Sequence, residues 1–141
     1  MPSPKLKVTT VLSKKDRKQI ADRLIAYNIE HFGDSDRQKL AIRLRDYAGV
    51  LSGGLVGYTA RGWLYVEMLF VPEEMRGQGL AGQLLQMAED EAKRRGCVGA
   101  YIDTMNPLAL DVYKRQGYQP VGSLEEMTGG HSLTWLKKRF S

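Results

Sequence analysis

The sequence predicts an α/β fold with a mixed, mostly antiparallel sheet and the element order β-α-β-β-β-α-β-α-β-β. Two observations support this fold class. Between residues 39 and 45 apolar side chains recur at every second position, as in a strand that buries one face, and a glycine-rich and a dense apolar strand follow. Further along, two stretches with helical spacing lie between short apolar runs, which is typical of strand–helix–strand units.

Length and composition favour one globular domain spanning residues 1–141. The chain has 141 residues, of which 43% are hydrophobic and 26% charged. A chain of this length buries a core without disulfides, and its one cysteine, Cys97, excludes an internal disulfide. Cys97 follows a predicted helix end, where a buried small residue is favoured over a nucleophile. No apolar run is long enough to cross a membrane and the amino terminus lacks a signal peptide, so we expect a cytoplasmic protein without a membrane partner.

The chain is moderately basic, with 21 Lys and Arg against 16 Asp and Glu, a formal net charge of +5. Such a charge is compatible with a phosphorylated cofactor, an acidic partner or nucleic acid. The basic residues are scattered, and no predicted helix combines a basic stripe with aromatic residues, so nucleic acid is not the favoured partner. Two distant histidines and one cysteine offer no metal-binding cluster, and no metal is expected.

The first half of the chain predicts a strand, a helix and a three-stranded meander. Residues 6–12 are rich in β-prone side chains and predict the first strand. Ser13 followed by Asp16 is typical of a helix start, and the helical pattern continues through residues 14–31, with His31 near the negative end of the helix dipole. Three strands joined by short turns follow, and they should pair antiparallel: residues 39–45, 50–58 and 63–71.

The second half begins with a long amphipathic helix over residues 78–95. A basic run stands at its carboxyl end and Gly96 suits the left-handed cap. A brief strand follows, and because a helix connects it to the preceding strand, the two should pair in parallel. Asn106 and Pro107 predict the start of a short helix. The remaining predicted elements are the strand at residues 98–102, the helix at 107–115 and the last two strands at 118–124 and 132–136.

The segment Arg76-Gly77-Gln78-Gly79-Leu80-Ala81 lies at the turn from a strand into a helix. The first turn of a helix has backbone N–H groups without partners, and the helix dipole makes this end positive. Gly77 and Gly79 have no side chains that would keep an anion from these groups. The segment therefore predicts a pyrophosphate site. It lacks the Gly-Lys-Ser/Thr of a nucleoside-triphosphate loop and the third glycine of a dinucleotide-binding loop.

This segment and a second one resemble the GNAT superfamily of acyl-CoA-dependent N-acetyltransferases. Val71 to Ala81 is similar to the end of the family's fourth strand and its Arg/Gln-x-x-Gly-x-Gly/Ala loop. Asn106 to Tyr118 is similar to the second signature, Asn-x-x-Ala followed by Tyr-x-x-x-Gly-Phe/Tyr. The resemblance covers residues 39–136 and implies a GNAT-like sheet whose fourth and fifth strands splay apart, with helices on both faces.

The resemblance implies acetyl-CoA as the cofactor and CoA as the product. Main-chain groups of the fourth strand would bind the pantetheine arm, and the loop amides would bind the pyrophosphate. Asn106 would face the CoA arm, although a helix cap explains it equally well. The residues implied in cofactor binding are Leu69, Phe70, Val71, Arg76, Gly77, Gln78, Gly79, Leu80, Ala81, Gly82 and Asn106.

Two residues are candidates for the proton transfers of amide formation. Tyr113 matches the family's usual general acid, which protonates the departing thiolate; otherwise it packs the short helix on the sheet. Glu67 is the only charge in an apolar strand, and it is the candidate base; it could also orient a cationic substrate or point to solvent. Asp103 could line the cleft or cap a turn, and His131 could reach the substrate.

The predicted function is transfer of an acetyl group from acetyl-CoA to an amine of a small molecule, peptide or protein, by direct attack in a ternary complex. The carboxylates Glu67 and Asp103 favour a cationic acceptor. One alternative is an acyl-CoA-binding module without turnover; another is a toxin-like acetyltransferase acting on aminoacyl-tRNA. A homodimer is possible, with Trp135 either in its contact or in the core.

Overall fold

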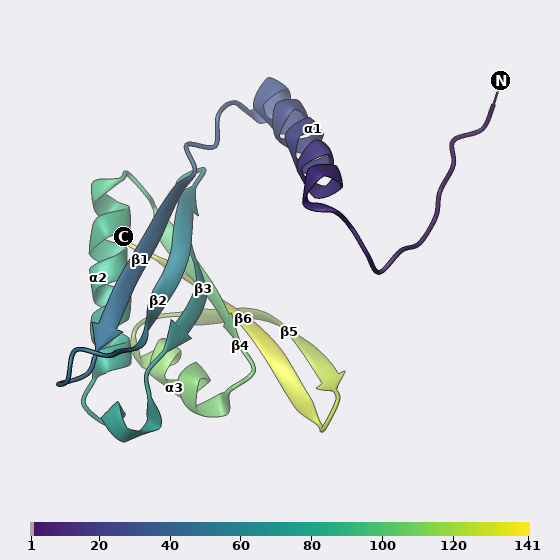
Figure 1. The fold of residues 1–141 in the computed structure, drawn as a ribbon. Coiled ribbons are helices and arrows are strands. Elements are labelled where there is room, and N and C mark those ends of the chain that lie inside the picture. Colours follow the sequence, from purple (N-terminus) through teal and green to yellow (C-terminus); the bar gives the residue numbers. More distant parts are fainter. Residues whose placement is uncertain (1) are drawn as a thin grey trace. The chain divides into compact units, whose positions relative to one another are not determined.

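The computed structural model describes residues 2–141 and shows a mixed α/β protein (Figure 1). The chain divides into two compact units, of which the first ends at Ser35 and the second spans Asp36–Ser141. The first unit holds one helix, α1 (Lys14–Phe32), and the second holds a six-stranded sheet with helices α2 (Leu80–Arg94) and α3 (Pro107–Arg115). A short 3-10 helix, η1 (Glu73–Met75), follows the third strand. A single domain over residues 1–141 stays a prediction.

Helix α1 begins where the sequence predicts, because the Ser13 side chain caps it by accepting a hydrogen bond from the Asp16 N–H at 3.0 Å. The predicted strand at residues 6–12 is wrong: that segment is irregular, and Leu6 and Val8 are 95% and 94% exposed. High β-propensity reflects packing on a paired, half-buried surface, and this segment has no strand to pair with.

The sheet has the strand order β1-β2-β3-β4-β6-β5. As predicted, the first three strands form an antiparallel meander, and β3 pairs with β4 in parallel across the α2 crossover. The remaining pairs, β4 with β6 and β6 with β5, are antiparallel. The strands are β1 (Gln38–Arg45), β2 (Leu51–Ala60), β3 (Trp63–Phe70), β4 (Gly99–Thr104), β5 (Gln119–Met127) and β6 (His131–Arg139).

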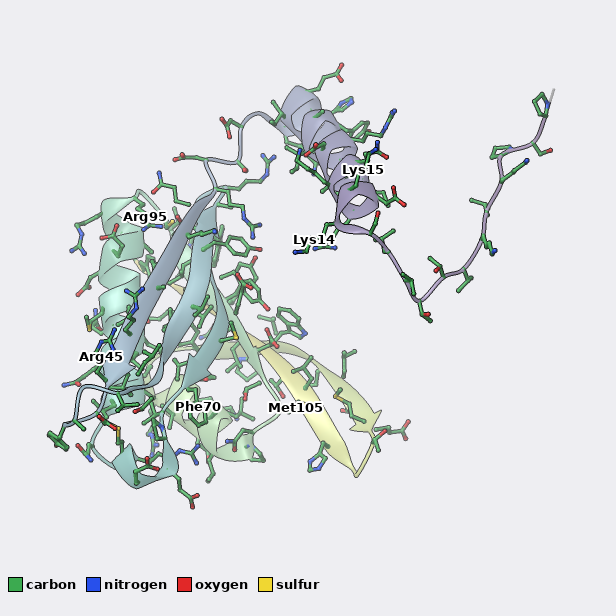
Figure 2. All side chains as sticks on the ribbon, in the orientation of Figure 1. Lys14, Lys15, Arg45, Phe70, Arg95 and Met105 are labelled. Atoms are coloured by element: carbon green, nitrogen blue, oxygen red, sulfur yellow. The ribbon has the colours of Figure 1, made fainter. Side chains whose placement is uncertain are left out.

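The core lies between α2 and one face of the sheet. Helix α2 contacts β1, β2, β3 and β4, and its predicted apolar stripe is buried, including Leu84, Leu85 and Ala88. Arg95 follows the helix and donates hydrogen bonds to the Thr59 side chain and the Gln38 carbonyl, at 3.1 and 3.3 Å (Figure 2). These bonds connect the carboxyl end of α2 to β2 and β1. Helices on both faces of the sheet remain a prediction.

Helix α3 begins at the predicted cap. The Asn106 side chain accepts a hydrogen bond from the Leu108 N–H at 2.9 Å, and Pro107 occupies the first helical position. The helix contacts both β4 and α2. Within residues 2–141, none of the helices is long and apolar enough to span a membrane.

Strands β3 and β4 separate towards their carboxyl ends, as the fold class predicts. Their pairing ends at Val66 and Ile102, whereas β3 continues to Phe70 and β4 to Thr104. A β-bulge in β3 accompanies this separation, because Gly57 pairs with Val66 and Val56 pairs with Met68, so that Glu67 has no partner in β2. The separated strands leave main-chain groups of β3 without a partner in β4, which gives a ligand access to the interior of the sheet.

Candidate active site

A cavity of about 720 Å³ extends from the separated strands to the start of α2 and is lined only by residues of the second unit. Figure 2 labels Phe70 at the end of β3 and Met105 just after β4, the two strands whose separation opens the cavity. All but one of the predicted cofactor-binding residues line it, and so does Tyr113. The exception is Gln78, which is exposed and is not among the lining residues. Other lining residues, not predicted from the sequence, are Thr104, Leu108, Ala109, Asp111, Val112, Arg115 and Gln116.

The amino-terminal end of α2 presents unpaired amides at one end of the cavity. The first intrahelical bond runs from the Gln83 N–H to the Gly79 carbonyl, so the N–H groups of the preceding three residues, Leu80, Ala81 and Gly82, have no partner within the helix. Gly77 and Gly79 have φ values of 81° and 75°, in the left-handed region that favours glycine. A Cβ atom at either glycine would meet no atom within 4 Å, so their backbone conformation, rather than crowding, explains glycine here.

Arg76 and Arg115 place positive charge at the rim of the same cavity. Arg76 donates a hydrogen bond from Nε to the Val71 carbonyl at 2.9 Å, and its guanidinium lies 5.9 Å from the centre of the Phe70 ring. Arg115 lines the cavity from the last turn of α3. Two cations beside oriented helix amides suit a ligand with several negative charges, such as a pyrophosphate.

Tyr113 lies on α3 and reaches the other part of the cavity. Its side chain is only 4% exposed, and burial, assisted by the negative charge of Asp103, raises the pKa of the phenol to about 12. At neutral pH the hydroxyl is therefore protonated and can donate a proton. The Tyr113 carbonyl also accepts a hydrogen bond from the Tyr118 N–H at 3.0 Å, which fixes the end of α3.

The two carboxylates considered from the sequence lie near the point where β3 and β4 separate. Glu67 occupies the bulge and is exposed, whereas Asp103 is half-buried and accepts a hydrogen bond from the Tyr65 hydroxyl at 2.8 Å. Burial, the bond to Asp103 and the charges of both carboxylates raise the pKa of Tyr65 above its usual value. Asp103 therefore influences both Tyr65 and Tyr113, although neither carboxylate lines the cavity itself.

Four aromatic residues, which the sequence analysis missed as a group, form a row across the sheet. This aromatic row consists of Tyr58, Tyr65, Tyr101 and Trp135, from β2, β3, β4 and β6. Tyr65 stacks on Tyr101 and Trp135 with ring centres 4.7 and 6.1 Å apart, and Tyr58 meets Tyr65 edge to face at 5.7 Å. Each tyrosine alternates with buried neighbours along its strand, but the strand register that brings them together cannot be read from the sequence.

A buried ion pair connects α2 to the last hairpin. Glu89, only 1% exposed, accepts hydrogen bonds from the Tyr118 hydroxyl at 2.9 Å and from Lys138 Nζ at 2.7 Å. The sequence analysis missed this group, because Glu89, Tyr118 and Lys138 are far apart in the chain. Tyr118 lies in the segment between α3 and β5, so its hydrogen bond to Glu89 ties the chain just after α3 to α2.

The other residues singled out from the sequence lie away from the main cavity. His131 lines a second cavity of about 210 Å³, which shares Thr104 and Asn106 with the first. Cys97 is half-buried against the core, and burial raises the pKa of its thiol, as suits a packing residue. His31 lies in the last turn of α1, with its ring tilted against that of Tyr27 and the ring centres 4.2 Å apart. No cluster of potential metal ligands occurs within the described chain, residues 2–141.

Comparison with known proteins identifies the family. Residues 10–118 match the model of the acetyltransferase (GNAT) family. This chain belongs to the GNAT family of acetyltransferases. An acetyltransferase of Agrobacterium fabrum is 56% identical to this GNAT protein over 133 residues, covering 94% of this chain and 97% of the relative.

Two further relatives agree with this assignment. The crystal structure of an acetyltransferase from Agrobacterium tumefaciens matches this GNAT protein with a TM-score of 0.93 and 54% identity, over 97% of this chain and all of the other. The blasticidin-S acetyltransferase of Streptomyces morookaense is 37% identical over 91 residues, covering 64% of this chain and 67% of the relative. The predicted GNAT fold is therefore confirmed, and the protein is an acetyltransferase.

The buried tyrosines predict a loss of stability at alkaline pH. The pKa values of Tyr65, Tyr101, Tyr113 and Tyr118 are all raised, chiefly by burial. A raised pKa favours the protonated form in the folded state, so this stability is complete below about pH 10 and is lost as pH rises further. The free energy of unfolding, measured in urea between about pH 9 and 11, should fall faster than for the Tyr118→Phe variant. Tyr47→Phe, at a tyrosine that is 99% exposed, should leave the slope unchanged; equal slopes for all three proteins would contradict this prediction.

Proposed function

We propose that this GNAT protein transfers the acetyl group of acetyl-CoA to an amine nitrogen of a small molecule or peptide, with both substrates bound together. One observation supports this proposal above the others: a single cavity joins the unpaired amides of α2 to the protonated hydroxyl of Tyr113. The same arrangement fits CoA, because the amides and two arginines suit a pyrophosphate and the unpaired edge of β3 suits an extended arm. Single-domain organisation, a cytoplasmic location and the possible homodimer belong to the proposal as predictions.

Residues of this chain have two tasks in the proposed reaction. Acetyl-CoA supplies an acetyl thioester, whose C–S bond breaks as the new C–N bond forms. Tyr113 donates its phenolic proton to the departing sulfur, which leaves as a thiol. Glu67 accepts the proton that the amine nitrogen loses, either directly or through a water molecule, because the β-bulge places it where β3 leaves β4. The amine and the thioester thus give an amide and a thiol; Glu67 then releases its proton to solvent and the Tyr113 phenol is reprotonated from solvent.

Calorimetric titration of acetyl-CoA tests the cofactor site. Gly79 has a positive φ, which aspartate and asparagine tolerate better than other side chains, so Gly79→Asp and Gly79→Asn form a matched pair that differs in charge. We expect Gly79→Asp to weaken acetyl-CoA binding by about tenfold or more relative to Gly79→Asn, because its carboxylate repels the pyrophosphate. Equal affinity of the two folded variants, or no binding by the unaltered protein, would contradict the proposed site.

Thiol release in the presence of an amine panel separates the proposed enzyme from an acyl-CoA-binding module. The enzyme should release CoA only when a suitable amine is present, whereas a binding module should release none. The same assay also tests the alternative of a toxin-like acetyltransferase that acts on aminoacyl-tRNA. Such an enzyme would acetylate the charged tRNA and would not turn over free amines.

A further inference from the structure

The aromatic row lies on the face of the sheet opposite to α2, just before the point where β3 and β4 separate. In β4 the residues Ala100 and Ile102 are buried in the core, so the alternating residues Tyr101 and Asp103 point to the other face. Cross-strand partners extend this face, since Tyr101 pairs with Tyr65 and Asp103 pairs with Trp135. Asp103 therefore lies on the same face as the aromatic row, next to the last residue pair before β3 and β4 separate.

The charges along this face are uneven. At one end, the Arg37 guanidinium lies 3.6 Å from the centre of the Tyr58 ring. Asp103 on β4 and Glu67 on β3 both act on Tyr65, within the row, and neither forms an ion pair with any residue among 2–141. In a protein with a net charge of +5, two carboxylates without a cationic partner beside an apolar aromatic surface are complementary to a positively charged ligand.

The contacts of the row keep Asp103 in a defined position. The Tyr65 hydroxyl donates to one oxygen of Asp103 at 2.8 Å, and the Tyr65 ring stacks on both Tyr101 and Trp135. Tyr58 meets Tyr65 edge to face and Tyr65 stacks on Trp135, so ring contacts connect the row from β2 to β6. A carboxylate fixed in this way has little conformational freedom to lose when it binds a cation.

We propose that Asp103, held by Tyr65, is a specificity-determining residue that binds a second positive charge on the acceptor, while the aromatic row packs against its carbon chain. The proposal rests on the proposed function, because it assigns the acceptor side of the same site. The substrate class is a small aliphatic diamine or a related dication, of which one nitrogen is acetylated and the other stays charged. The positive charge of Arg37, beside Tyr58, disfavours binding of the diamine's charged nitrogen at that end of the row. This repulsion sets the orientation of the diamine.

Binding of the diamine can be measured without turnover. The two tryptophans of the chain are Trp135, within the row, and Trp63, whose ring centre lies 6.5 Å from that of Tyr101. Tryptophan fluorescence should therefore respond when cadaverine is titrated into the full-length protein, with or without CoA. We expect n-pentylamine, which lacks the second charge, to bind about tenfold more weakly or worse.

Asp103→Asn tests the assignment, because the asparagine keeps an oxygen that accepts the Tyr65 hydrogen bond and removes the charge. We expect this variant to lose at least about tenfold in cadaverine affinity and to stop distinguishing cadaverine from n-pentylamine. The matched control is Asp90→Asn, the same change at an exposed position on α2, and it should bind both amines as the unaltered protein does. The cadaverine affinity of Tyr65→Phe should lie between those of Asp103→Asn and Asp90→Asn, because in Tyr65→Phe Asp103 keeps its charge and loses the hydrogen bond that fixes its position.

The outcomes separate this proposal from the proposed function. If the unaltered protein binds acetyl-CoA and does not distinguish the two amines, or if Asp103→Asn retains the preference, the assignment of Asp103 is wrong and the acetyltransferase proposal stands. If cadaverine binds as expected and no amine of the panel, cadaverine included, leads to thiol release, the cation site stands and the proposed reaction is wrong.

Discussion

Tyr113→Phe should lower kcat by about a hundredfold and leave the dissociation constant of acetyl-CoA unchanged. The reason is that the phenol is buried, protonated at neutral pH and part of the cavity wall, so it can give a proton to the departing sulfur. Phenylalanine keeps the ring that packs between α3 and the sheet and removes only the hydroxyl. The effect should therefore appear in turnover, measured as thiol release at saturating amine and acetyl-CoA.

The alternative for Tyr113 is that it only packs α3 on the sheet. In that case Tyr113→Phe, which keeps the packing ring, would leave the melting temperature nearly unchanged and kcat within about twofold of the unaltered value. Tyr47→Phe is the matched control, since Tyr47 is 99% exposed, and it should change neither quantity. Measuring stability and turnover on the same preparations separates the two roles.

Glu89→Ala should lower the free energy of unfolding by about 3 kcal/mol, as expected when a buried ion pair loses one partner. Glu89 is almost fully buried, and its removal leaves the Lys138 ammonium and the Tyr118 hydroxyl without their acceptor. The value lies at the lower end of the range for buried pairs because the Lys138 side chain is 23% exposed and can turn towards water. Urea unfolding monitored by circular dichroism measures the change.

A double-mutant comparison tests whether the ion pair causes this loss. Lys138→Met removes the cation, and the combination of Glu89→Gln with Lys138→Met removes both charges while keeping an acceptor for Tyr118. The double variant should be more stable than the sum of the single changes predicts, since a buried pair is costly to break and nearly neutral to replace. Additive effects would show that Glu89 and Lys138 stabilise the fold independently.

Much of the fold could be predicted from local patterns. The start of α1 followed from Ser13 and Asp16, and the start of α3 followed from Asn106 and Pro107, because capping depends on neighbours in the chain. The meander and the parallel β3–β4 pair followed from short turns and from the handedness of crossovers. The predicted strand at residues 6–12 was wrong because propensity alone cannot supply a pairing partner.

The candidate site could be predicted where it is local in sequence and not where it depends on register. The glycine loop and Tyr113 lie in two short signatures, and both line the cavity. The bulge at Glu67 is set by how β2 and β3 align, and the bond between Tyr65 and Asp103 by how β3 and β4 align. A change of one position in either alignment would turn these side chains to the other face, and composition holds no information about it.

The large cavity and the aromatic row are built from differently distributed parts of the sequence. Every residue that lines the large cavity lies between Leu69 and Gln116, one continuous stretch of the sequence, whereas the aromatic row draws on strands from Tyr58 to Trp135. If the proposed roles hold, substitutions at dispersed positions can alter the choice of acceptor while the continuous stretch proposed to bind CoA stays intact. We therefore expect related enzymes to diverge in their acceptor amine sooner than in their use of acetyl-CoA as the donor.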